Sequence, residues 1–140
     1  MEILTAVLCD SAADYHGKLC ILGAFDTIAA SRFPVVHPHC SVAVRLLFKD
    51  EDIGKHSLQI MPIDTDGKNI LPAAPPKWEF DLQKIPEETF FLSRNFVLNF
   101  QGLFFQKPAQ YSFDITLDDR IIARIPLQAV QIQEGGGRRS

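Results

Sequence analysis

The last third of the chain alternates apolar and polar side chains without a fault over residues 111–117. An Asp118-Asp119 turn follows, and a second extended segment begins at residue 120. Because successive side chains of a strand point to opposite faces, a period of two places one face on a core and the other in water. The pattern predicts an antiparallel hairpin and constrains the chain toward an all-β fold.

Similar segments recur along the chain and are separated by turn signals, whereas helical periodicity is absent over any long stretch. The expected strands, about eight in number, cover residues 3–9, 18–27, 40–48, 55–63, 77–82, 91–103, 110–117 and 120–132. Residues 10–17 and 29–38 are expected to be connections. Short strands without crossover helices predict a mostly antiparallel β-sandwich, Ig-like or jelly-roll-like.

Composition indicates an ordinary globular domain with neither nucleic acid nor membrane as a partner. The chain has 140 residues, of which 46% are hydrophobic and 22% charged, and its formal net charge is −3. No cluster of Lys and Arg is present that could bind phosphates, and no apolar run approaches the roughly 20 residues of a membrane span. We expect a single sandwich domain over residues 1–133 and a flexible Gly/Arg tail over residues 134–140.

The cellular compartment is suggested by the cysteines and by the start of the chain. There are three cysteines, an odd number, and the opening residues lack the basic segment of a secretory signal. Both features favour reduced thiols in the cytoplasm. We therefore expect a cytoplasmic location.

Phenylalanine supplies most of the expected core, with eleven residues, eight of them between Phe80 and Phe113. Phe96 and Phe113 lie at core positions of their alternating segments, so we expect both to be buried. The adjacent pair Phe104-Phe105 must point to opposite faces of an extended chain. Either the segment is a strand buried on both sides or a loop folded back on the core, or one ring belongs to an exposed patch for a partner or a second copy.

The pair Phe90-Phe91 follows the same logic and is also expected to point to opposite faces.

The best metal-like cluster is His37-Pro38-His39-Cys40, which Cys9 or Cys20 would have to complete from other strands. Zinc takes about four such ligands in a tetrahedron. The usual ligand spacings are absent, however, and buried cysteine commonly behaves as a small hydrophobic residue. His37, His39 and Cys40 therefore remain weak candidates, and we expect neither a metal nor another cofactor.

The first third resembles the opening of a family of small bacterial proteins that carry only an unknown-function label. The resemblance is carried by residues 6–10 (AVLCD) and 14–26 (DYHGKLCILGAFD). Residues 94–96 and the closing hairpin are compatible with it, so the resemblance covers most of the chain. It implies a bacterial source, and it transfers no catalytic or binding residue. On physical grounds, residues 14–18 form a turn, and a strand follows that is broken or bulged at Gly23.

Catalytic motifs such as GxSxG, HExxH or a phosphate-binding loop are absent from the sequence. The favoured function is a non-catalytic protein-binding or self-assembly module. The alternative is a carbohydrate- or small-ligand-binding sandwich in which exposed Trp78 and Tyr111 stack on the ligand. A metal-dependent hydrolase built around the His37 cluster is less favoured, because fold alone does not specify an activity. The candidate binding residues are Trp78, Phe104, Phe105 and Tyr111.

Overall fold

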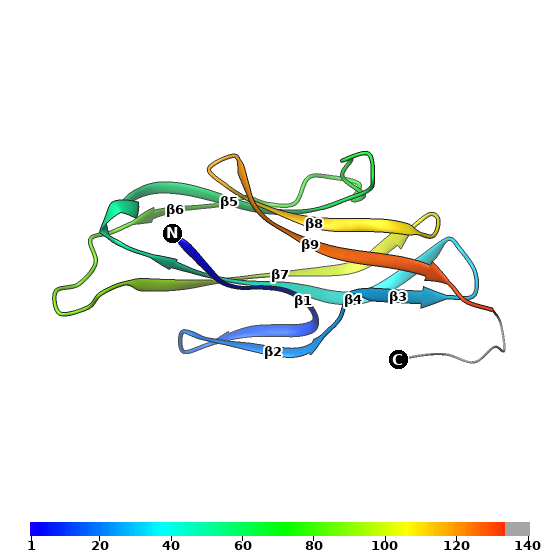
Figure 1. The fold of residues 1–140 in the computed structure, drawn as a ribbon, viewed down its shortest axis with the longest axis horizontal. Helices are drawn as coiled ribbons and strands as arrows, with labels where there is room; N and C mark the ends of the chain where they lie inside the picture. The colour runs from blue at the N-terminus through cyan, green and yellow to red at the C-terminus, as the bar shows by residue number, and fades with distance from the viewer. Residues whose placement is uncertain (134–140) are drawn as a thin grey trace.

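The computed structural model describes residues 1–133, which form nine strands in two sheets packed face to face (Figure 1). The first sheet has four strands in the order β2-β1-β4-β7, and the second has five in the order β3-β9-β8-β5-β6. The strands are β1 (Glu2–Tyr15), β2 (Lys18–Ala24), β3 (Thr27–Ala30), β4 (Val35–Phe48), β5 (Gly54–Ile63), β6 (Trp78–Leu82), β7 (Leu92–Phe105), β8 (Ala109–Leu117) and β9 (Arg120–Gln131).

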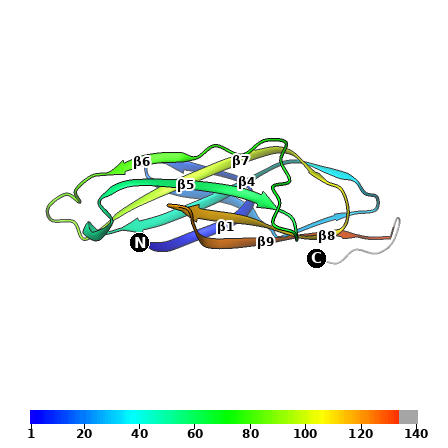
Figure 2. The same ribbon diagram turned by 90° about the horizontal axis from the view of Figure 1, so that it is seen from above.

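The prediction of an all-β sandwich is confirmed. All pairs of neighbouring strands in the two sheets are antiparallel except β3 and β9, which run parallel. Seen from above, the strands of both sheets run roughly along the long axis of the molecule (Figure 2). The closing hairpin forms as predicted, with Asp118 and Asp119 at φ 52° and 65°, the left-handed conformation that two-residue hairpin turns require. The predicted tail lies outside the described residues.

The core lies between the two sheets and is built from the alternating faces of β4, β5, β7 and β8. Phe96 and Phe113 are both buried, as predicted, and the rings of Phe100 and Phe113 lie 5.3 Å apart between centroids. The largest fully buried side chains include Phe48, Phe105 and Phe113. Phenylalanine therefore anchors the contact between the sheets, since its burial leaves no polar group without a partner.

Two expected connections are partly strand. β1 does not end near residue 9 but continues to Tyr15, and residues 27–30 form β3. β4 begins at Val35 and contains Pro38, although residues 29–38 were expected to be a loop. Proline is tolerated there because β4 has only β7 as a neighbour at that level, since its pairing with β1 begins at Ser41.

The first strand changes partners along its length. Residues 2–9 of β1 pair with β4, and from Cys9 onward β1 pairs with β2. The resulting folded-back hairpin, residues 10–24, lies on the side of β4 and β7 that faces away from the second sheet (Figure 1). Ser41 and Ala43 on that outer face are fully buried, at 0% exposure, even though their neighbours in β4 fill the core. The hairpin is thus a partial third layer.

Candidate interaction surface

The tip of the folded-back hairpin is a tight two-residue turn. His16 and Gly17 adopt φ values of 50° and 80°, which match the right-handed twist of the two strands that they join. The Oδ1 atom of Asp14 accepts a hydrogen bond of 2.9 Å from the backbone N–H of Gly17. The turn expected for residues 14–18 is therefore confirmed.

A polar network fixes this tip to the sheet beneath it. The Nη1 atom of Arg45, on β4, donates to the carbonyl oxygen of Gly17 at 2.8 Å and to Oδ1 of Asn95 at 2.7 Å. Its Nη2 atom donates to Oγ of Ser93 at 2.8 Å. Asn95 in turn donates from Nδ2 to Oδ2 of Asp14 at 3.3 Å. Hydrogen bonds to a guanidinium are stronger than neutral ones, so Arg45 is the main anchor of the hairpin.

The backbone conformation at the far end of the hairpin requires a glycine at position 23. Gly23 has φ 70°, and a Cβ atom built on it would lie 2.6 Å from Oδ2 of Asp10 on the paired strand. Both the left-handed backbone and the close approach of the carboxylate require the absence of a side chain. The bulge or break predicted at Gly23 corresponds to this conformation.

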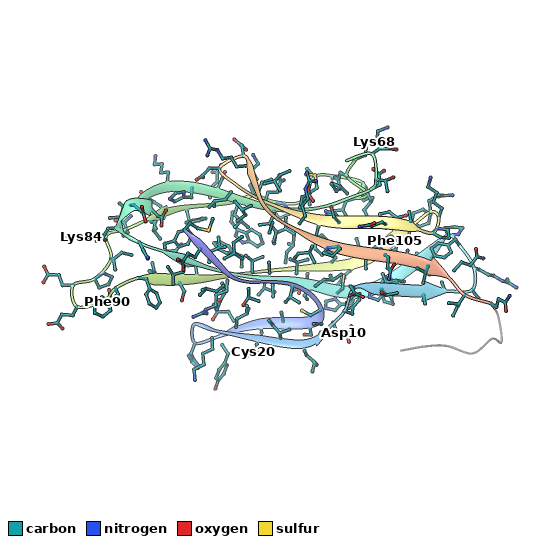
Figure 3. The ribbon with its side chains drawn as sticks, viewed as in Figure 1. Asp10, Cys20, Lys68, Lys84, Phe90 and Phe105 are labelled. Atoms are coloured by element: carbon teal, nitrogen blue, oxygen red, sulfur yellow. The ribbon has the colours of Figure 1, made fainter. Side chains whose placement is uncertain are left out.

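The hairpin exposes apolar side chains instead of burying them. β2 is an edge strand of seven residues, and the five that follow Leu19 are all exposed, the largest fraction among the large apolar side chains being that of Leu22 at 70%. Tyr15 is 61% exposed at the turn, and Cys20 is exposed on the same hairpin (Figure 3). An edge strand also presents unpaired backbone N–H and C=O groups on its free side. β2 therefore combines open hydrogen-bonding groups with apolar side chains.

Neither of the two residues predicted for ligand stacking belongs to the exposed class. Tyr111 is buried, so the expectation that it is exposed is wrong; its hydroxyl donates to the carbonyl oxygen of Lys107 at 2.9 Å. The alternation of β8 places Tyr111 on the core face with Phe113, which explains its burial. Trp78 is half-buried, and its ring packs edge-on against Phe96 at 5.6 Å between centroids.

The two phenylalanine pairs behave differently. Phe104 is exposed and Phe105 fully buried, as expected for neighbours on β7. Phe104 pairs across the sheet with Val36, which is also exposed, so the two form a small apolar spot. In the other pair, Phe90 and Phe91 are both exposed. They precede β7 and so lie outside the pleated strand on which the expected alternation depends.

The His37 cluster is divided by the strand that carries it. His37 and His39 lie on one face of β4, whereas Cys40 lies on the core face. Burial raises the pKa of the Cys40 thiol to about 12, and the nearby charges of Cys9 and Asp10 add to the shift. A protonated thiol is a poor metal ligand and nucleophile. Within residues 1–133, no three His, Cys, Asp or Glu side chains gather closely enough to hold a metal ion.

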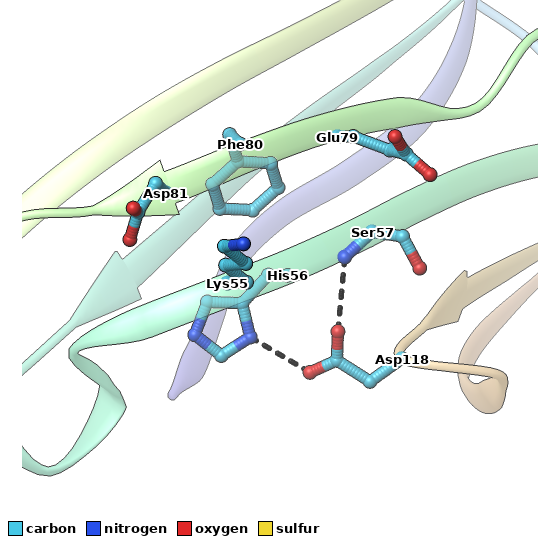
Figure 4. A pocket seen from close by; sticks show the side chains of 7 residues that line it. All are labelled: Lys55, His56, Ser57, Glu79, Phe80, Asp81 and Asp118. Carbon is cyan, nitrogen blue, oxygen red and sulfur yellow. Dashed lines mark hydrogen bonds and ion pairs between the residues drawn. The ribbon is translucent and has the colours of Figure 1, made fainter.

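A pocket of about 500 Å³ lies beside β5 and β6 and contains a histidine that the sequence did not single out (Figure 4). His56 Nδ1 lies 2.7 Å from Oδ2 of Asp118, and Nε2 lies 2.5 Å from the carbonyl oxygen of Asp52. Oδ1 of Asp118 also accepts a hydrogen bond of 2.9 Å from the backbone N–H of Ser57. The residues of the His56–Asp118 pair are 62 positions apart, and no sequence motif connects them.

The surroundings of His56 favour its protonated form. Burial by itself would lower its pKa, but the hydrogen bonds to Asp52 and Asp118 outweigh burial and raise it. Both partner atoms can only accept hydrogen bonds while Asp118 is ionised, so both ring nitrogens of His56 donate. A ring that donates from both nitrogens has no lone pair with which to take a proton. His56 therefore acts as a cross-link between β5 and the closing hairpin and is not placed as a general base.

Comparison with known families identifies the chain as a member of one. Residues 4–130 match the family of unknown function DUF6941, to which the chain therefore belongs. The predicted resemblance to a family with an unknown-function label is confirmed. No curated protein matches the sequence. Among the described residues, no helix has the length and apolar character to span a membrane.

Proposed function

We propose that this member of a family of unknown function is a non-catalytic protein-interaction module that binds its partner by strand addition along β2. The observation that carries the proposal is the open edge of β2, with its exposed Ile21 and Leu22. In strand addition, backbone hydrogen bonds along the edge supply affinity, and side chains on either face supply selectivity. An exposed apolar edge strand is otherwise a liability that soluble proteins protect.

The opposite edge of the same sheet supports the choice of β2. β7 is the other edge strand of the first sheet, and β6 is an edge strand of the second sheet. Side chains of these two strands pack against each other. Trp78 and Phe80 both contact the ring of Phe96, and the guanidinium carbon of Arg94 lies 5.3 Å from the centroid of the Phe80 ring. Aromatic rings and the Arg94 guanidinium therefore lie where β6 and β7 meet, and these contacts hold β7 against the second sheet.

The chemistry of the buried polar groups also favours binding over catalysis. Both nitrogens of His56 face hydrogen-bond acceptors of the protein, and the raised pKa of Cys40 keeps its thiol protonated at neutral pH. Neither group is placed to activate a nucleophile. The carbohydrate-binding alternative is weakened because Tyr111, one of its two expected stacking residues, is buried.

The proposal is tested with a charge on the edge strand and a matched charge elsewhere. Leu22→Lys places a cation on the apolar face of β2, and Phe90→Lys places one on the most exposed aromatic residue, which is 89% exposed and lies in the loop before β7. We expect Leu22→Lys to abolish the association of the chain with itself in sedimentation velocity, or its capture of partners present in cell extract. Phe90→Lys should retain the association. Equal binding by both variants would reject β2 as the contact.

A further inference from the structure

We infer that the strand added to β2 is the β2 strand of a second copy of this chain, antiparallel to the first across a two-fold axis that passes near Leu22. This inference rests on the proposed function and names the partner. The pairing would join the two first sheets into one continuous sheet across both copies. Because both copies use the same edge, the contact is isologous and closes at the dimer instead of growing into a fibre.

Charge complementarity favours a second copy in this orientation. β2 begins with a cation, Lys18, and the next charged residue along the chain is an anion, Asp26. Both side chains are exposed. Lys18 and Asp26 are equally distant from Leu22 in sequence, so antiparallel pairing about Leu22 places Lys18 of each copy opposite Asp26 of the other. Parallel pairing would instead set the two lysines side by side, which is unfavourable.

The backbone remains alongside β1 as far as Phe25. Beyond the printed end of β2, the backbone N–H of Phe25 still donates to the carbonyl oxygen of Leu8 at 3.0 Å. The chain leaves the first sheet only at Asp26, whose carbonyl oxygen accepts from the backbone N–H of Gln128 at 2.9 Å. Asp26 therefore lies where the edge ends. Its carboxylate is exposed, and Oδ1 accepts a hydrogen bond of 2.7 Å from Oγ1 of Thr27.

The same register pairs apolar side chains across the axis. Leu22 of one copy opposes Leu22 of the other, and Cys20 opposes Ala24. Cys20 and Leu22 share one face of β2, and all three residues are exposed in the single chain. Cross-strand contact between apolar residues adds to the backbone hydrogen bonds of the new ladder. One edge thus supplies hydrogen bonds, apolar contact and two symmetrical ion pairs.

Disulfide trapping tests the register directly. In a Cys20→Ser background, Leu22→Cys places two thiols opposite each other across the axis, within the Cα separation of about 4.4–6.8 Å that a disulfide spans. We expect rapid formation of a covalent dimer under mild oxidation of the purified full chain. The matched control, Phe90→Cys in the same background, is equally accessible but lies off the edge and should remain monomeric. Wild-type Cys20 opposes Ala24 and should also fail to cross-link.

A charge exchange tests the ion pairs independently of any cysteine. Lys18→Asp and Asp26→Lys should each weaken the dimer roughly tenfold in sedimentation equilibrium, because each removes two exposed pairs and sets like charges together. The double variant restores opposite charges and should recover the wild-type dissociation constant. Failure of the double variant to recover, or cross-linking of Leu22→Cys no faster than that of Phe90→Cys, would overturn the inference.

The two proposals fail in different ways. Self-pairing is rejected if the purified chain stays monomeric and Leu22→Cys forms no covalent dimer. Strand addition to another protein still stands if, in addition, Leu22→Lys loses a captured partner that Phe90→Lys keeps. If Leu22→Lys changes neither self-association nor capture, both proposals are rejected.

Discussion

The sandwich and the folded-back hairpin are held in place by different forces. The sandwich buries large apolar side chains between its sheets, including Phe48, Phe105 and Phe113. The hairpin lies over the outer face of β4, where the small residues Ser41 and Ala43 are buried, and is fixed at its tip by Arg45. Its own large side chains, such as Leu22, face solvent. The difference suggests that stability resides in the sandwich, whereas the hairpin is free to serve recognition.

The largest expected effect is a loss of stability of the sandwich. Phe113→Ala removes a fully enclosed ring and should lower the free energy of unfolding by about 3–5 kcal/mol, through lost burial and the cavity left behind. Leu22→Ala on the hairpin should change it by less than about 0.5 kcal/mol at concentrations where the chain is monomeric. Chemical denaturation measures both. Similar losses for the two variants would contradict the division between the two regions.

A smaller effect releases the hairpin from the sheet. Arg45→Ala removes three hydrogen bonds and leaves the carbonyl oxygen of Gly17 without its guanidinium donor. We expect a loss of about 1–3 kcal/mol, with faster hydrogen exchange confined to residues 10–24. Arg124→Ala, which removes an ion pair at 3.5 Å between the exposed guanidinium and the buried Asp114 of the second sheet, is the control and should leave the hairpin unchanged. Uniformly faster exchange over both sheets would mean that Arg45 supports the whole sandwich.

The far end of the hairpin should respond to an added methyl group. Gly23→Ala strains a left-handed backbone and drives Cβ against Asp10, so we expect a loss of about 1–3 kcal/mol. Gly67 has a similar φ, 78°, but no atom lies within 4 Å of a Cβ built on it. Gly67→Ala should therefore lower stability only through the strain of the left-handed backbone. The difference between the two variants isolates the contact with Asp10. Thermal denaturation with equal shifts for both would show that the carboxylate moves aside freely.

The smallest expected effect depends on pH and lies in the sandwich. The folded state raises the pKa of His56, since its hydrogen bonds outweigh burial, so its stabilising contribution is complete below the unfolded pKa near 6.5 and is lost as pH rises through the folded pKa. The pKa of Asp118 is lowered, because its hydrogen bonds from His56 and Ser57 outweigh burial, so its contribution is lost only in acid.

Wild-type stability relative to His56→Asn should therefore decrease from pH 6 to pH 8. Asp118→Asn should reduce the same dependence, because it deletes the carboxylate that His56 faces and leaves only the contact with the Asp52 carbonyl. Urea denaturation across this range provides the measurement. If the difference in unfolding free energy between wild type and His56→Asn does not change with pH, protonation of His56 is not coupled to folding.

Local alternation was sufficient to predict most of the sandwich. Phe96, Phe113 and the Asp118-Asp119 turn lie where the period of two places them, because pleated strands with one buried face follow that pattern. Tyr111 obeys the same alternation, and the error was to treat its ring as exposed. Phe90 escaped the pattern because it belongs to a loop.

The hairpin and its anchors could not be predicted by the same reasoning. Arg45 and Asn95 occupy polar positions of strands, and such positions are normally assigned to solvent. Their contacts with Gly17 join segments 28 and 78 residues apart, so no local spacing reveals them. An apolar run such as that of β2 also does not distinguish a central strand from an open edge, since the pattern carries no information about neighbours.

The most direct test of this account measures stability and association on the same variant. For Leu22→Lys, the account predicts an unfolding free energy within about 0.5 kcal/mol of wild type under monomeric conditions, together with loss of the dimer in sedimentation equilibrium. A stable variant that still forms the wild-type dimer would contradict it, and so would a variant that loses the dimer only because the sandwich unfolds.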